Sequence, residues 1–286
     1  MLKNQYFGVE VEFTGISRKD AANVIAQHFG TIASAPGYDC YKTITIQDNY
    51  GRNWKIMRDA SIEPQPYRDD YKCELVTPKL RYEDIETLQE IIRKLRHAGA
   101  KSNSSCGVHV HIDASNHNEQ SLRNVVYYMR EKEDILFKAL NVSSERASRW
   151  CRKLDTDFLE DIQKRACKKQ GMEGLEKAWY KKYPGKDAHY NQSRYHALNL
   201  HNVWYRGTVE FRLFNGTMHA GEIRAYVNLC LGISARALTQ KGSLIFANKG
   251  SVENEKKQFK NHLRNCLGFK GAEFKNVIEH LTKHLA

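Results

Sequence analysis

The sequence predicts an α+β protein with a largely antiparallel sheet, and three observations lead to that class. Runs of alternating polar and apolar residues, typical of strands, lie at both ends of the first 215 residues, with helical patterns inserted between them and filling the C-terminal part. The strands and helices do not alternate regularly, as they would in a parallel sheet. Hydrophobic residues make up 41% of the 286, which is enough for a sizeable core and argues against intrinsic disorder.

Seven alternating runs are expected to form the strands. They are residues 6–14, 41–47, 53–58, 72–77, 107–113, 196–201 and 208–214. In the first run the apolar side chains share one face, and Glu10 and Glu12 therefore share the other. The second and third runs are joined by Asp-Asn-Tyr-Gly at 48–51, which predicts a hairpin.

Helical periodicity predicts six helices in addition to these strands. They are about 17–29, 85–98, 119–140, 219–240, 252–266 and 271–284. Ser17 is expected to cap the first of them and Gly30 to end it. Residues 144–187 contain twelve Lys and Arg against eight Asp and Glu, with little strand signal, and we expect them to form helices with a basic face.

Charge and cysteine content restrict the classes of function. The 45 Lys and Arg exceed the 33 Asp and Glu by 12, so the surface should attract anions such as nucleic acid, nucleotides or acidic metabolites. The seven cysteines are scattered singly, which argues against a disulfide framework or a zinc knuckle and favours a reducing compartment. Neither a secretory signal nor a membrane-spanning stretch is visible, so we expect a cytoplasmic protein with no membrane partner.

Three of the predicted strands place two polar groups at alternate positions, and hence on one face. The pairs are Glu10 with Glu12, His109 with His111, and Glu210 with Arg212. Two carboxylates on one face repel each other and are costly to desolvate, and a bound cation removes both penalties. The alternative is an edge strand with a half-exposed acidic face.

The other two pairs also have a functional and a purely structural interpretation. Two histidines at alternate strand positions have a common metal-ligand spacing, but they could equally be hydrogen-bonded residues lining a sheet. Glu210 and Arg212 could form an ion pair that needs no ligand. Arg194, which enters a predicted strand, carries a guanidinium group suited to phosphate oxygens.

Taken together, these pairs favour a site for a nucleotide with divalent cations. If the strands form one sheet, their polar faces could converge on a single concave surface. Carboxylates bind hard cations such as Mg²⁺, while a histidine makes Mn²⁺ a plausible substitute. The sequence has neither a P-loop nor a GxGxxG motif, so phosphates would have to be held by metal and arginine.

The order of these motifs resembles the glutamine synthetase and glutamate–cysteine ligase superfamily of carboxylate–amine ligases. The chain is most similar to its "putative amidoligase" family, over about residues 5–235. The matching segments are FGVEVEF at 7–13, DASI at 59–62, ELVTP at 74–78, CGVHVH at 106–111 and EFR at 210–212.

The resemblance implies a glutamine synthetase-like fold, with a curved antiparallel sheet whose concave face binds ATP and two or three divalent ions. We expect an amidoligase-like catalytic domain at 1–240 that includes the basic helical insertion at 144–187, and after it a C-terminal helical extension at 241–286, which the resemblance does not cover. The implied reaction is ATP-dependent ligation of a carboxylate to an amine through an acyl phosphate. The substrates would be small molecules or peptides, and the cofactors ATP and Mg²⁺ or Mn²⁺.

The resemblance also implies roles for individual residues. The implied metal ligands are Glu10, Glu12, Glu74, His109 and Glu210. His111 would lie near the nucleotide, and Arg194 and Arg212 would contact phosphate and act in catalysis. Asp59 and Glu63 are further candidates for metal ligands.

Two other functions are compatible with the sequence. A metal-dependent hydrolase could use the two histidines at 109 and 111 with further ligands among His189, His196 and His201. A nucleic-acid-binding protein is suggested by the net charge and by the aromatic residues of the basic segment, which are Trp150, Trp179, Tyr180 and Tyr183. We favour aromatics packed beneath a solvated helix face. The basic segment could instead bind an acidic protein or peptide.

Overall fold

The computed structural model describes residues 1–241 and 254–286, which form two compact units. The strand-rich unit comprises Lys3–Val110 and Phe214–Val227. The helix-rich unit comprises Met1–Leu2, His111–Leu213 and Asn228–Ala286. Two strands and one α-helix contribute residues to both units, namely β5 (Gly107–Asp113), β7 (Thr208–Asn215) and α9 (Ala220–Thr239).

The strand-rich unit contains four complete strands and the start of β5. The complete strands are β1 (Phe7–Phe13), β2 (Ile44–Gln47), β3 (Asn53–Met57) and β4 (Cys73–Val76). Their order in the sheet is β2-β3-β4-β1-β5, and β2 with β3, β3 with β4, and β4 with β1 are antiparallel. The predicted hairpin joins β2 to β3. Because β1 lies between β4 and β5, the interpretation of Glu10 and Glu12 as residues of an edge strand is wrong.

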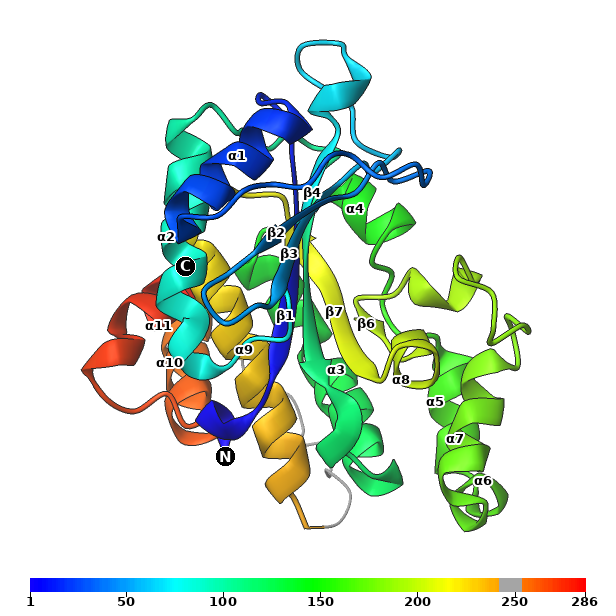
Figure 1. The fold of residues 1–286 in the computed structure, drawn as a ribbon. Coiled ribbons are helices and arrows are strands. Elements are labelled where there is room, and N and C mark those ends of the chain that lie inside the picture. Colours follow the sequence, from blue (N-terminus) through cyan, green and yellow to red (C-terminus); the bar gives the residue numbers. More distant parts are fainter. Residues whose placement is uncertain (242–253) are drawn as a thin grey trace. The chain divides into compact units, whose positions relative to one another are not determined.

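Local signals define the helices that pack on this sheet. Helix α1 (Arg18–Phe29) begins after Ser17, whose hydroxyl accepts the Asp20 N–H at 3.1 Å, and ends at Gly30 with a φ of 67°. It packs against β2, β3 and helix α2 (Ile85–His97) (Figure 1). Strand β2 begins three residues later than predicted, because the chain turns at Lys42, where φ is 47°.

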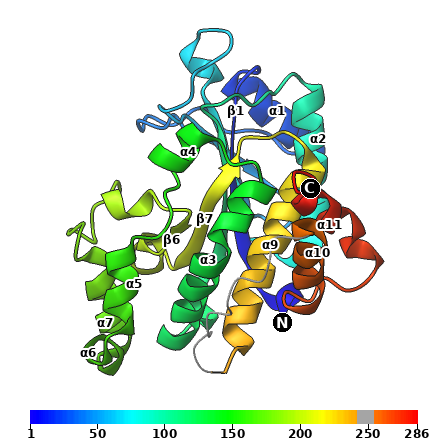
Figure 2. The same ribbon diagram turned by 180° about the vertical axis from the view of Figure 1, so that it is seen from behind.

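The helix-rich unit contains most of the helices. They are α3 (Glu119–Ala139), α4 (Ser144–Arg149), α5 (Thr156–Gln163), α6 (Arg165–Lys169), α7 (Gly171–Tyr180), α8 (His201–Tyr205), α10 (Glu255–Asn265) and α11 (Lys275–Thr282). Helices α5, α6 and α7 pack together, and α7 also contacts α3 (Figure 2). The helical prediction for 144–187 is confirmed up to Tyr180, whereas residues 181–187 form no helix. Trp179 and Tyr180 are buried, which supports aromatics packed beneath the helices.

The predicted strand at 196–201 is mostly wrong. Strand β6 contains only Leu198–Asn199, which pairs antiparallel with β7 and places Asn199 opposite Glu210. The strand ends because the Asn199 side-chain oxygen accepts the backbone N–H of His201 at 2.8 Å, which starts α8. Of the predicted helix at 252–266, residues 252 and 253 lie outside the described residues, and α10 covers most of the remainder.

The structure confirms the α+β class, with antiparallel strand pairs and many helices. The curved glutamine synthetase-like sheet stays a prediction. All seven cysteines lie in the described part of the chain and are free thiols, as their spacing predicted. Among the helices of residues 1–241 and 254–286, none has the length and apolar character that crossing a bilayer requires.

Candidate functional site

The strand-rich unit brings four of the predicted metal ligands together, and we call them the acidic group: Glu10, Glu12, Glu74 and His109. Glu10 and Glu12 lie on β1, and the antiparallel register places Glu74 of β4 directly opposite Glu12. Like charges at opposed strand positions destabilise a sheet, and burial increases the cost. Only 6% of Glu12 is exposed, so a positive charge nearby stabilises this pair.

His109 of β5 lies between the two carboxylates of β1. Its Nδ1 is 3.0 Å from Glu10 Oε2, and its Nε2 is 3.8 Å from Glu12 Oε1. The backbone N–H of Gly107 donates to Glu12 Oε2 at 2.6 Å. His109 is 4% exposed, so its imidazole lies in the protein interior and not on a solvated sheet face.

Two overlapping sets of residues within this unit could hold a divalent cation. Glu10, Glu74 and His109 each offer a ligand atom, and these atoms lie within 4.8 Å of one another. Glu12, Asp59 and Glu74 form a second such set, which gives Asp59 a place in the acidic region. Carboxylate oxygens with one imidazole suit Mg²⁺ or Mn²⁺. Glu63 belongs to neither set and is exposed.

The helix-rich unit holds a second arrangement, which we call the glutamate–arginine group: His111, Glu210 and Arg212. Glu210 is fully buried, and its Oε1 accepts the Arg212 Nη1 hydrogen at 2.5 Å. The ion pair expected as the structural alternative is therefore present. His111 Nε2 is 3.9 Å from the same oxygen, and His111 Nδ1 is 3.1 Å from Thr208 Oγ1.

Two asparagines that the sequence analysis did not identify complete the environment of Glu210. Asn199 and Asn202 each donate a side-chain N–H to Glu210 Oε2, at 2.5 and 2.6 Å. A carboxylate has about four lone-pair positions, and these two bonds with the Arg212 bond use three of them. The orientation of Glu210 is thereby fixed. The position of Asn199 opposite Glu210 follows from the strand register, which the sequence does not reveal.

The two predicted phosphate-binding arginines lie near a shared aromatic ring. The guanidinium carbons of Arg194 and Arg212 are 5.8 and 5.9 Å from the centre of the Tyr195 ring. Arg194 also lies 5.4 Å from the Tyr190 ring and donates to the His189 carbonyl oxygen at 3.2 Å. Stacking on aromatic rings holds both guanidinium groups in a fixed orientation without neutralising their charge.

A third arginine, Arg146, approaches the same segment from α4. It is 4% exposed and donates from Nη2 to the backbone oxygen of Arg212 at 3.1 Å. No motif marks Arg146 in the sequence, where it is one of many basic residues between 144 and 187. Its contact depends on the packing of α4 near β7, which only the tertiary structure defines.

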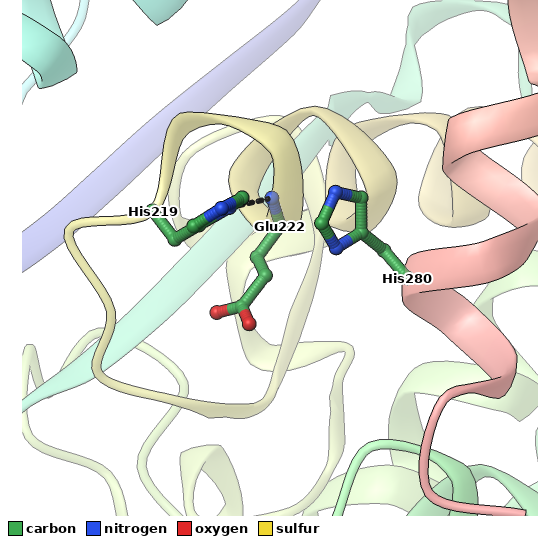
Figure 3. A group of neighbouring side chains, drawn as sticks. All are labelled: His219, Glu222 and His280. Atoms are coloured by element: carbon green, nitrogen blue, oxygen red, sulfur yellow. Dashed lines mark hydrogen bonds between the residues drawn. The ribbon is translucent and has the colours of Figure 1, made fainter.

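Other histidines have structural partners. His201 Nδ1 is 2.6 Å from the Tyr180 hydroxyl, and burial lowers the pKa of His201. The ring of His219 accepts the Glu222 backbone N–H at 3.2 Å and so caps the first turn of α9 (Figure 3). These contacts give His201 and His219 structural partners within the protein.

Comparison with known proteins identifies one family. Residues 3–234 match the family model described as "Putative amidoligase enzyme". The match includes every residue of the acidic group and of the glutamate–arginine group. A search of curated proteins finds no match to this chain.

Proposed function

Because the chain belongs to this amidoligase family, we propose that it is an ATP-dependent ligase that joins a carboxylate to an amine. The observation that carries the proposal is the acidic group, in which the buried Glu12 faces Glu74 across two paired strands beside His109. A divalent cation would lower the electrostatic cost of this group, and a ligase that uses ATP requires divalent cations for the triphosphate.

In this proposal Glu10, Glu12, Glu74 and His109 hold Mg²⁺ or Mn²⁺. Metal bound there would neutralise charge on the β- and γ-phosphate oxygens of ATP. The sheet fixes the positions of the carboxylates before the nucleotide arrives, since β1 is hydrogen-bonded to a strand on each side. The Gly107 N–H orients Glu12, so one of its oxygens is directed by the backbone and the other faces His109.

The glutamate–arginine group would act on the transferred phosphoryl group. Arg212 and Arg194 would donate hydrogen bonds to phosphate oxygens, and Glu210 would hold Arg212 in the orientation that this requires. The three bonds to Glu210 fix the orientation of its carboxylate, and we retain Glu210 as a further metal ligand in the proposal. His111, which is 3.9 Å from Glu210, would lie beside the nucleotide.

The reaction follows from the poor leaving group of a carboxylate. An oxygen of the substrate carboxylate takes the γ-phosphoryl group of ATP, which gives an acyl phosphate and ADP. The amine then attacks the acyl carbon, inorganic phosphate leaves, and the amine loses a proton. Orientation of the two bound reactants would supply much of the rate enhancement.

The first test measures thermal unfolding with nucleotide and metal. ATP or ADP with Mg²⁺ or Mn²⁺ should raise the melting temperature, and a ligand at about 100 times its Kd stabilises by about 2.7 kcal/mol. Nucleotide without metal should have a much smaller effect. Equal shifts with and without metal would contradict the proposal.

The second test removes one charge of the acidic group. Glu12→Gln should abolish ATP-dependent phosphate release while retaining the fold, because the amide keeps an oxygen for the Gly107 N–H. Glu86→Gln is the matched control, because Glu86 is an exposed residue of α2 in the same unit. Full activity of Glu12→Gln would overturn the metal role assigned to that residue.

A further inference from the structure

A pocket with a volume of about 330 Å³ lies within the helix-rich unit. Residues of α5 and α7 and the segment that precedes β6 line it, and they include Asp155, Trp179, Lys182 and His196. None of the residues that line it belongs to the acidic group or to the glutamate–arginine group. The function proposed above therefore assigns no role to this pocket.

His196 presents a hydrogen-bond acceptor to this pocket. Its side chain is 3% exposed, and its Nδ1 is 2.8 Å from the backbone oxygen of Ser193. Since a carbonyl oxygen only accepts, Nδ1 must carry the proton, and in the neutral ring Nε2 is then an acceptor. Burial lowers the pKa of His196, which favours the neutral ring. Nε2 has no hydrogen-bond partner among residues 1–241 and 254–286.

A carboxylate lies beside this acceptor. Asp155 Oδ2 is 3.5 Å from His196 Nε2, so with the ring neutral and protonated at Nδ1 both atoms are acceptors. The ammonium group of Lys182 is 3.3 Å from the same carboxylate oxygen, but its side chain is 57% exposed and lies toward solvent. A positively charged hydrogen-bond donor could bind to Asp155 Oδ2 and His196 Nε2 together.

The lining as a whole, with Asp155 included, favours a cation over an anion. It contains four acidic residues (Asp155, Asp157, Glu160, Asp161) and three lysines (Lys164, Lys181, Lys182), a net charge of −1 in a chain of net charge +12. All three lysines are already paired, two with Asp161 and one with Asp155. The basic face predicted for this segment is therefore neutralised around the pocket.

Aromatic rings form an apolar wall next to the two acceptors. Trp179 is 5% exposed and makes edge contacts with Phe158 at 5.1 Å and with His196 at 5.7 Å between ring centres. The Tyr183 ring lies 6.4 Å from that of His196. Aromatic faces attract cations and also pack against apolar groups. One carboxylate and one imidazole beside a lysine are too few ligands for a divalent metal.

We propose that this pocket binds the protonated primary amine of a small organic ligand. The ammonium group would donate to His196 Nε2 and Asp155 Oδ2, and the apolar part of the ligand would pack against Trp179. Binding requires neither ATP nor a metal. It can therefore be tested independently of ligase activity, and the failure of one proposal leaves the other intact.

The first experiment is a calorimetric titration with benzylamine at about pH 7.5, where an alkylamine is protonated. Benzyl alcohol, which has the same ring without the charge, is the control ligand. We expect saturable binding of benzylamine and at least about tenfold weaker binding of benzyl alcohol, equivalent to about 1.4 kcal/mol. Equal affinity for the two ligands, or no saturation by about 10 mM benzylamine, would overturn the proposal.

A pair of variants separates the specific contact from general attraction by negative charge. Asp155→Asn should weaken benzylamine binding at least about tenfold. Asp157→Asn removes the same charge from an exposed residue that also lines the pocket, and it should retain affinity within about threefold. Equal losses in the two variants would reduce the effect to long-range electrostatics and contradict the proposal.

A measurement on the unaltered protein gives an answer even if Asp155→Asn does not fold. Nitrogen NMR of the imidazoles should show His196 protonated at Nδ1 and bare at Nε2, with benzylamine shifting the Nε2 resonance. A ligand-free protein in which Nε2 carries the proton and donates to Asp155 would lack the acceptor, and the proposal would fail.

Discussion

Replacing Glu133 by glutamine is expected to stabilise the protein at neutral and alkaline pH. Glu133 lies on α3 within a run of charged residues, yet it is 1% exposed. Its carboxylate accepts the Leu154 N–H at 3.1 and 3.3 Å. Burial raises the pKa of Glu133 from 4.5 to about 7, because the charged form is poorly solvated there.

The sign and size of the effect follow from this pKa. The folded state holds the proton more tightly than the unfolded state, so the contribution of Glu133 is fully present below pH 4.5 and is lost as the pH rises to about 7. Two and a half pH units at about 1.4 kcal/mol each correspond to about 3 kcal/mol. Glutamine stays neutral and keeps an oxygen for Leu154, so Glu133→Gln should avoid this loss.

Urea denaturation between about pH 4.5 and 8 measures the free energy of unfolding of both proteins. The advantage of Glu133→Gln should be small at the acidic end and approach about 3 kcal/mol at the alkaline end. Asp134→Asn is the control, because the neighbouring Asp134 side chain is 62% exposed and should change stability by less than about 0.5 kcal/mol. A difference between Glu133→Gln and the parent that does not vary with pH would refute the reasoning.

Three further predictions concern catalysis, the backbone and acid stability. Arg212→Lys should lower the rate of ATP-dependent phosphate release about a hundredfold while the fold is retained. The reason is that lysine lacks the planar pair of hydrogen-bond donors that a guanidinium group offers to phosphate. An unchanged rate would exclude the role of Arg212 in phosphate binding. Gly15→Ala should cost at least about 2 kcal/mol in urea denaturation, because φ is +84° and the new Cβ would lie 2.4 Å from the Gly99 oxygen. Gly30→Ala, with a φ of +67° and open space, should cost only about 1 kcal/mol; equal losses would contradict this. Burial lowers the pKa of His262 from 6.5 to about 4, so its contribution to stability is lost as the pH falls from 6.5 to 4. His262→Gln should reduce this loss. If the free energy of unfolding of the variant depends on pH as that of the parent does in this range, His262 is not the source of the loss.

Elements with strong local signals could be predicted from the sequence. The alternation in β1, β5 and β7 and the Ser17 and Gly30 caps of α1 depend on neighbouring residues alone, and the structure confirms them. The strand predicted at 196–201 is mostly wrong because a side chain competes with the hydrogen bonds between strands. The His201 N–H donates to the Asn199 side-chain oxygen and not to a neighbouring strand. Such competition has no periodic signature.

Some residues of the candidate site could also be predicted from local patterns in the sequence. Glu10, Glu12 and His109 follow from alternate positions on two strands, and they lie together as predicted. Asn199, Asn202 and Arg146 were missed because their contacts join residues that only register and packing bring together. The charge of residues 144–187 was misleading around the pocket, since a count along the chain does not show which lysines are already paired.

The position of β1 in the sheet decides how its carboxylates should be interpreted. Alternation alone is equally consistent with an exposed edge strand, where Glu10 and Glu12 would be solvated at little cost. An internal strand removes that option, and the register then sets the buried Glu12 against Glu74 with His109 as the nearby partner. A divalent cation would offset more of the charge of these carboxylates than one protonated imidazole can. Strand order and register therefore determine whether these carboxylates favour a divalent cation. Urea denaturation of Glu12→Gln tests this directly. In the presence of a chelator the variant should unfold at a higher urea concentration than the parent, and it should lose that advantage when Mg²⁺ or Mn²⁺ is added.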